Sequence, residues 1–161
     1  MATFDEIKQS FWGPDSYGVL PPLTSEAVIE AERLLDVTLP ASLIDLLSIQ
    51  NGGQVVPGLQ ACPTTEPTSW SEDHVPVDQL MGIGRKDNVL SLLDTPYLVQ
   101  EWELPEPLAL LTGDGHWWIA LDYRKSGRRG EPSVVWLDVE RSEELVLAAD
   151  FRAFVERLTS P

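Results

Sequence analysis

The sequence predicts an α+β domain in which helices pack against a mainly antiparallel sheet. Three observations predict it. Apolar residues recur at helical spacing in the first 51 residues and again near the C-terminus. Between these helices, residues 108–112, 117–123 and 134–139 have the apolar or alternating pattern of strands. The first two of these strands are separated by Gly113-Asp114-Gly115, which is typical of a hairpin turn because glycine adopts positive φ at little cost.

The hairpin of residues 107–123 is the clearest element. Trp117, Ile119, Leu121 and Tyr123 alternate with His116, Trp118, Ala120 and Asp122. Period-2 alternation places the first set on one face of a sheet and the second set on the other. The first face is wholly apolar, so we expect it to lie on the core, whereas the mixed second face is either half covered or open to a partner. Residues 134–139 and 145–147 would extend the hairpin to a meander of three or four strands.

Helices are expected over residues 3–12, 24–36, 40–51 and 150–159. Thr24 or Ser25 is a suitable N-cap for the second helix, and Asp150 for the last. Ala27, Ala31 and Leu35 give the second helix a core-facing stripe. Asn51-Gly52-Gly53 offers a glycine for the left-handed C-cap of the third helix.

The remaining segments are less regular. Residues 54–76 predict a long loop with a short strand near 55–56, and residues 77–83 a short strand or turn. Residues 88–93 predict one or two helical turns, and residues 97–102 fit either a helix end or a strand. We therefore expect one domain over residues 1–161, with its sheet region at 77–148.

Charge and composition exclude several classes of protein. The net charge is −15, and residues 1–123 carry four Lys/Arg against nineteen Asp/Glu. This argues against nucleic-acid binding, which needs a basic surface, and fits either simple solubility or steering toward a basic partner. There is no apolar run long enough to span a membrane and no signal-peptide pattern, and Cys62 is the single cysteine. We expect a cytoplasmic protein that does not bind membranes.

Groupings of residues for catalysis are sparse, and we expect no catalytic residue, metal or cofactor. Cys62, His74 and His116 lack the spacing of a zinc site, and no third group is evident for a Cys62–His74 nucleophile and base. A metal-dependent hydrolase using His74 with Glu72, Asp73 and Asp78 is the weakest alternative. The basic segment 124–132 fits a solvated loop, or else a site for phosphate or for an acidic partner.

Three segments carry a resemblance to a known family. Residues 23–53 combine an amphipathic helix, the Leu39-Pro40 step and a second helix that closes on Asn51-Gly52-Gly53. Residues 108–123 give the glycine–aspartate–glycine hairpin, and residues 134–139 are followed by Asp150-Phe151-Arg152-Ala153-Phe154. In this order the chain resembles the SUKH superfamily, in its yeast cell-wall-synthesis-regulator branch, over residues 3–158. Residues 54–76 and 95–106 depart from the family pattern.

The resemblance implies a SUKH-like α+β fold with a mixed, mainly antiparallel sheet. It also implies a role: bacterial members are often immunity proteins encoded beside secreted toxins, many of them nucleases, which they neutralise by binding and not by catalysis. We therefore expect a protein-binding domain, monomeric or weakly dimeric, whose partner is a cognate basic toxin. An intracellular regulatory or scaffold protein, as in the eukaryotic branch, is the alternative.

Two acidic stretches that each contain a tryptophan are the predicted contact surface, because tryptophan is enriched at interface hot spots. The first is Glu66, Trp70, Glu72, Asp73 and Asp78. The second is Glu101, Trp102, Glu103 and Glu106. For Trp70, packing over the core is the competing interpretation.

Overall fold

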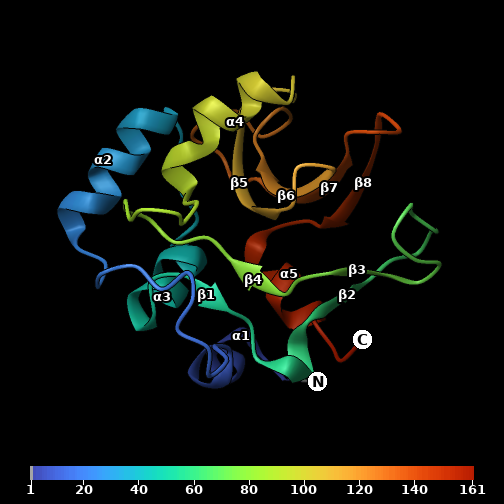
Figure 1. The fold of residues 1–161 in the computed structure, drawn as a ribbon, viewed down its shortest axis with the longest axis horizontal. Coiled ribbons are helices and arrows are strands. Elements are labelled where there is room, and N and C mark those ends of the chain that lie inside the picture. Colours follow the sequence, from blue (N-terminus) through green and yellow to red (C-terminus); the bar gives the residue numbers. More distant parts are fainter. Residues whose placement is uncertain (1) are drawn as a thin grey trace.

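The computed structural model describes residues 2–161 and confirms the α+β class (Figure 1). The helices are α1 (Phe4–Ile7), α2 (Ser25–Leu35), α3 (Ala41–Ile49), α4 (Thr95–Glu101) and α5 (Phe151–Arg157), with 3-10 turns η1 (Lys8–Ser10), η2 (Pro57–Leu59) and η3 (Leu92–Asp94). The strands are β1 (Gly53–Gln54), β2 (Ala61–Pro63), β3 (His74–Pro76), β4 (Gln79–Leu80), β5 (Leu108–Gly113), β6 (Trp117–Asp122), β7 (Ser133–Asp138) and β8 (Glu143–Ala148). No helix in the described chain is long and apolar enough to cross a membrane.

The largest sheet is a four-stranded meander in the order β5-β6-β7-β8. The two smaller sheets pair β1 with β4 and β2 with β3. Every strand pair among residues 2–161 is antiparallel, so the mixed pairing that the resemblance implied is not found there. The meander has register irregularities between Leu110 and Thr112 and between Val134 and Val135.

The predicted hairpin is formed by β5 and β6. The Asp114 carboxylate closes the turn by accepting hydrogen bonds from the backbone N–H groups of His116 and Trp117. Ile119, Leu121 and Tyr123 are fully buried, as their alternation predicted. The hydroxyl of Tyr123 donates to the carbonyl of Thr38 at 2.8 Å, which ties the strand end to the segment between α2 and α3.

The N-caps of two helices are those that the sequence predicts. Thr24 and Asp150 cap α2 and α5, each accepting from a backbone N–H three residues on. At the other end of α2, the C-cap Asp36 has the left-handed conformation. The Asp36 carboxylate pairs with Arg129 and Arg128, and the Asp36 carbonyl also accepts a hydrogen bond from Arg128. Ion pairs within the chain therefore hold much of the basic segment 124–132. Residues 124–129 are exposed, as expected of a solvated loop, and Arg124, Arg128 and Arg129 are paired with carboxylates of the same chain.

The Asn51-Gly52-Gly53 motif has a different role from the predicted C-cap, because α3 ends at an extended Gln50. The Asn51 side chain is buried and joins two distant segments. It donates to the carbonyls of Pro21 and Ile83 and accepts from the N–H of Ile83, each at 2.8 Å. A Cβ on Gly82 would lie 2.4 Å from the Asn51 carbonyl oxygen, so this close approach requires glycine there. Asn51 thus joins the segment before α2 to the segment after β4.

The prediction of one long loop over residues 54–76 is wrong at residues 61–63 and 74–76, which form strands. β2 and β3 form a hairpin in which Cys62 pairs with Val75, and β1 lies at residues 53–54 instead of 55–56. The sheet region therefore begins before residue 77. Residues 79–80 form β4, and residues 97–102 belong to a helix, α4, with Trp102 as its C-cap. The turn predicted at 88–93 is displaced to η3.

The core lies between the meander and the N- and C-terminal helices. α1 packs on α5, and α5 packs on α3, β7 and β8. Buried aromatic side chains from both ends of the chain belong to this one core. Phe4, Phe11, Phe151 and Phe154 are fully buried. One face of the meander is thereby covered by helices. The other face contains the candidate site.

Candidate functional site

The two faces of the four-stranded sheet have different neighbours. The face that carries Ile119, Leu121 and Trp136 lies on the core, and we call it the core face. The opposite face carries Trp118, Val135 and Val146, and we call it the outer face. α4 packs against β5 and shields the outer face on that side (Figure 1). At the edge strand β8 the outer face is open, because Val146 is exposed there, whereas Val135 and Leu137 on β7 are buried.

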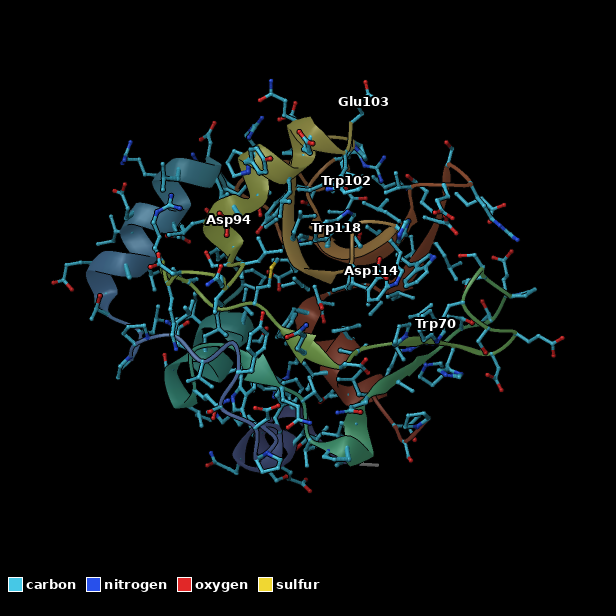
Figure 2. All side chains as sticks on the ribbon, in the orientation of Figure 1. Trp70, Asp94, Trp102, Glu103, Asp114 and Trp118 are labelled. Atoms are coloured by element: carbon cyan, nitrogen blue, oxygen red, sulfur yellow. The ribbon has the colours of Figure 1, made fainter. Side chains whose placement is uncertain are left out.

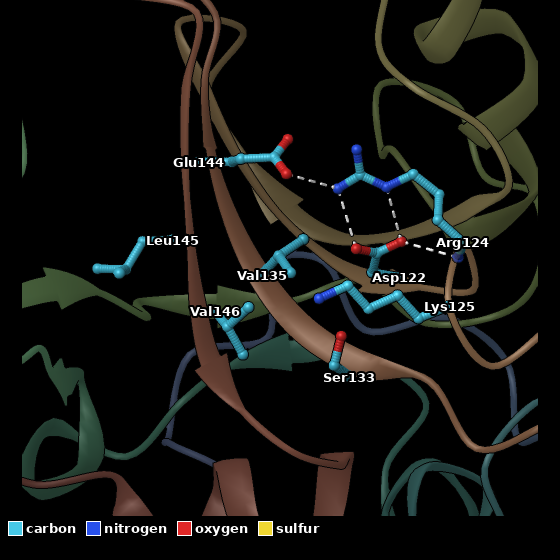
Figure 3. Close-up of a pocket in the computed structure, with 8 residues that line it drawn as sticks. All are labelled: Asp122, Arg124, Lys125, Ser133, Val135, Glu144, Leu145 and Val146. Carbon is cyan, nitrogen blue, oxygen red and sulfur yellow. Dashed lines mark hydrogen bonds and ion pairs between the residues drawn. The ribbon is translucent and has the colours of Figure 1, made fainter.

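The opening consists of two adjacent cavities of about 440 and 480 Å³ that share Arg124 and Glu144. We call them together the β8 groove. Figure 3 shows the first cavity, which lies over β7 and β8 beside Arg124. The groove is lined by Trp102, Glu103, Leu104, Pro105, Asp122, Arg124, Lys125, Ser133, Val135, Leu137, Asp138, Val139, Ser142, Glu143, Glu144, Leu145 and Val146.

The floor of the β8 groove is apolar and its rim is mainly acidic. Val135 and Leu137 form the floor and are buried, whereas Val146 on the edge strand is 58% exposed. Glu103, Glu143 and Glu144 stand on the rim of the second cavity. Within residues 2–161, neither Glu103 nor Glu143 forms an ion pair. An apolar floor with free carboxylates around it suits a partner surface that is both apolar and basic.

Arg124 crosses the groove and joins two strands. Its Nε and Nη2 donate to the two carboxylate oxygens of Asp122 on β6 at 3.0 and 2.9 Å, and Nη2 also donates to Glu144 on β8 at 3.0 Å (Figure 3). Burial tends to raise the pKa of Asp122, but the hydrogen bonds from Arg124 outweigh it and hold that pKa below its usual value. The same pairing raises the pKa of Arg124 above that of a free guanidinium. The groove thus keeps a fixed ionic bridge at its centre.

Trp102 forms one wall of the groove because of the hairpin turn. Gly115 has φ +100°, and a Cβ there would lie 2.9 Å from the Trp102 ring, so the indole packs directly on this glycine. Trp102 remains 37% exposed. Glu103 follows with φ +53°, which turns the chain sharply away from α4 toward β5. Figure 2 places Trp102 and Glu103 above Trp118 at this end of the sheet.

The structure divides the predicted contact residues among three places. Of the second stretch, Trp102 and Glu103 line the β8 groove. Glu101 and Glu106, close to them in sequence, are exposed. Of the first stretch, Glu66, Trp70, Glu72 and Asp73 belong to the β2–β3 loop, which we call the Trp70 loop (residues 64–73). Asp78 lies apart from both, in a hollow with Asp15 and Gln54.

The Trp70 loop is fastened to the core-face side of the sheet. The Trp70 side chain is 52% exposed, and its ring lies edge to face with Trp117 at a centroid distance of 6.3 Å. Trp117 in turn stacks on Trp136 at a centroid distance of 4.9 Å. The Ser69 hydroxyl donates to the buried carboxylate of Asp138 on β7. Trp70 therefore packs on the sheet and also keeps part of its ring exposed.

The residues considered for catalysis are used otherwise. Cys62 is fully buried in β2, and burial raises the pKa of its thiol to about 11, although Arg157 opposes the shift, so the thiolate is scarce at neutral pH. His74 bonds to Asp73 at 2.8 Å, and His116 bonds to Glu140 at 2.6 Å. In the described part of the chain, no three His, Cys, Asp or Glu side chains gather closely enough to hold a metal ion.

Sequence reasoning missed the residues on the β8 side of the groove, namely Arg124, Glu143, Glu144 and Val146. The sequence predicted that the mixed face of β6, which includes Asp122, is either half covered or open to a partner, and Trp118, Ala120 and Asp122 are buried there. The alternation of Glu144, Val146 and their neighbours could have marked β8 as an edge strand, but the two adjacent glutamates obscured it.

Comparison with known proteins agrees with this fold. The model of the SMI1 / KNR4 family (SUKH-1) matches residues 22–157. The chain belongs to the SMI1 / KNR4 family. Domains of this SUKH-1 family are generally non-catalytic and bind partner proteins. No curated protein matches the chain at the level required to count as a relative. The SUKH-1 match includes both walls of the β8 groove and the Trp70 loop.

Proposed function

We propose that this SUKH-1 domain is a non-enzymatic immunity protein that neutralises a basic toxin, such as a nuclease, by direct binding. The β8 groove is the contact surface. The observation that carries the proposal is the apolar floor between free carboxylates, with Val146 and Trp102 exposed on its walls. A basic toxin face would bury these side chains and neutralise Glu103 and Glu143 together.

The distribution of charge supports the proposal. The net charge is −15, and most Lys and Arg side chains are occupied by carboxylates of the same chain, among them Lys8, Arg33, Arg85, Arg124, Arg128, Arg129 and Arg152. The acidic surplus therefore faces solvent. Such a field accelerates association with a basic partner and weakens as salt screens it.

The test is binding to the toxin-domain product of the gene next to that of this protein. The tagged protein is co-expressed with that product, the complex is purified, and association rates are measured between low and high salt. We expect a stoichiometric complex whose association slows with salt. The double variant Glu103→Lys/Glu143→Lys should slow association about tenfold or more at low salt and flatten its salt dependence.

The control is Asp45→Lys/Asp87→Lys, which changes the net charge equally at two exposed carboxylates away from the groove. It should lower the rate much less, through the overall field alone. If no complex forms with a toxin domain, the immunity function is wrong and the regulatory or scaffold role gains weight. If the complex forms but both double variants behave alike, the groove is not the contact surface.

A further inference from the structure

The two edges of the four-stranded sheet are treated differently. At the β5 edge, the N–H of Leu110 donates to the Thr95 hydroxyl at 3.1 Å, and the carbonyl of Leu111 accepts from the N–H of Met81 at 2.8 Å. At the β8 edge, residues 143–146 make no backbone hydrogen bond to the described chain other than those to β7. β8 is thus an open edge with unused N–H and C=O groups, which can accept another strand.

The usable length of this edge is set by the sheet itself. Glu143, Glu144, Leu145 and Val146 pair in regular register with β7, and the register shifts at Leu147. Leu147 and Ala148 are buried, whereas Glu143, Glu144 and Val146 are exposed. Four residues therefore present a straight, accessible edge next to the β8 groove.

These four residues form two pairs of unlike chemistry. Two carboxylates come first and two apolar side chains follow. Because neighbouring strands place opposite residues side by side on the same face, a strand added here puts one residue beside each of the four. Glu144 and Val146 would receive their neighbours on the outer face, above the groove, and Glu143 and Leu145 on the core face.

We propose that β8 binds an extended segment of the toxin by strand addition, and that this segment reads, from its N-terminus, two apolar residues followed by two Lys or Arg residues. The order assumes the antiparallel pairing that all strands described here use. The apolar residues lie beside Val146 and Leu145, and the basic residues beside Glu144 and Glu143. This inference rests on the proposed function and specifies the partner's binding segment.

Charge complementarity favours this occupant over a second copy of the chain. Opposite residues of neighbouring strands share a face, so a symmetric antiparallel pair of β8 strands is centred on one residue. Centred on Glu144, it sets the two Glu144 carboxylates against each other and Glu143 against Leu145; centred on Leu145, it sets Glu144 against Val146. Cations near the strand also agree with the assignment. Lys125 lines the groove at the Val146 end, where apolar neighbours are expected, and Arg124 uses only one oxygen of Glu144.

The test uses blocked hexapeptides and backbone amide exchange of residues 143–146. The probe is Thr-Val-Val-Lys-Lys-Thr, and the control of identical composition is Thr-Val-Lys-Val-Lys-Thr. We expect the probe at millimolar concentration to slow exchange at β8, with the control binding about fivefold more weakly because two of four pairs are mismatched. The variant Glu143→Lys should weaken the probe about fivefold, and the swapped peptide Thr-Val-Val-Lys-Glu-Thr should restore its binding.

Each outcome has a distinct meaning. Equal binding of the two peptides, absence of protection at β8, or failure of the charge swap each overturn strand addition. If the complex with the toxin domain forms while exchange at residues 143–146 is unchanged, the immunity function stands and strand addition is wrong. If the hexapeptide protects β8 but no toxin binds, the edge recognises this pattern and the immunity function fails.

Discussion

The core face and the outer face of the meander are made by the same strands, yet only the core face is fully covered by other parts of the chain. On the core face, Trp136 and Ile119 are buried, and α5 packs on β7 and β8 with α1 and α3 behind it. On the outer face, β5 and β6 are shielded by α4 and residues 102–105, whereas β7 and β8 line an open groove. The difference separates side chains that stabilise the fold from side chains that are free to meet a partner.

The largest expected effect on stability comes from a substitution on the buried core face. Trp136→Ala removes a buried indole stacked on Trp117 and should lower the free energy of unfolding by about 3–5 kcal/mol. Val146→Ala, on the next strand but on the open face, should lower it by less than about 1 kcal/mol. Urea denaturation of both variants measures the difference. Similar losses would mean that the outer face at β8 is not open in solution.

An intermediate effect on stability is expected at the Arg124–Asp122 ion pair inside the groove. Arg124→Ala leaves the Asp122 carboxylate, which is little exposed, without its bidentate partner and should cost about 1–2 kcal/mol at neutral pH. Because the folded pKa of Asp122 lies below its unfolded value, this contribution is present above the unfolded pKa, near 4, and is lost as pH falls through the folded pKa.

The pH dependence distinguishes this bridge from lost packing. The stability gap between the wild type and Arg124→Ala should narrow as the pH is lowered from 6 to 2.5 in urea titrations. The matched control is Arg33→Ala, which removes an exposed i,i+3 pair with Glu30 and should change stability little at any pH. A gap that stays constant with pH would show that Arg124 acts through its packing alone.

The sequence predicted the elements that depend on local pattern and missed those that depend on distant partners. The β5–β6 hairpin follows from alternation and a glycine-rich turn, and the caps Thr24 and Asp150 follow from side chains that bond three residues ahead. In contrast, β2 and β3 have three residues each and contain prolines, and only their pairing across residues 64–73 makes them strands.

The candidate site divides along the same line. Trp102 and Glu103 were found because an aromatic beside acids is visible in the sequence. Their partners across the groove, Leu137 and Glu143, are more than thirty residues away in the chain and are brought there by the meander. Trp70 looked equally conspicuous, yet contacts with Trp117 and β7 fasten its loop to the core-face side.

The smallest expected effect concerns this Trp70 loop and sharpens the comparison of the two surfaces. Trp70→Ala removes the edge-to-face contact with Trp117 and should cost about 0.5–1.5 kcal/mol in urea denaturation, whereas Trp70→Phe keeps an aromatic edge and should cost less. Because Trp70 does not line the β8 groove and Trp102 does, Trp70→Ala should leave the affinity for the toxin within about twofold, while Trp102→Ala should weaken it about tenfold or more. Calorimetric titration of both variants with the toxin domain measures this. A larger loss for Trp70 than for Trp102 would move the contact surface to the core-face side and make the acidic Trp70 loop the binding element.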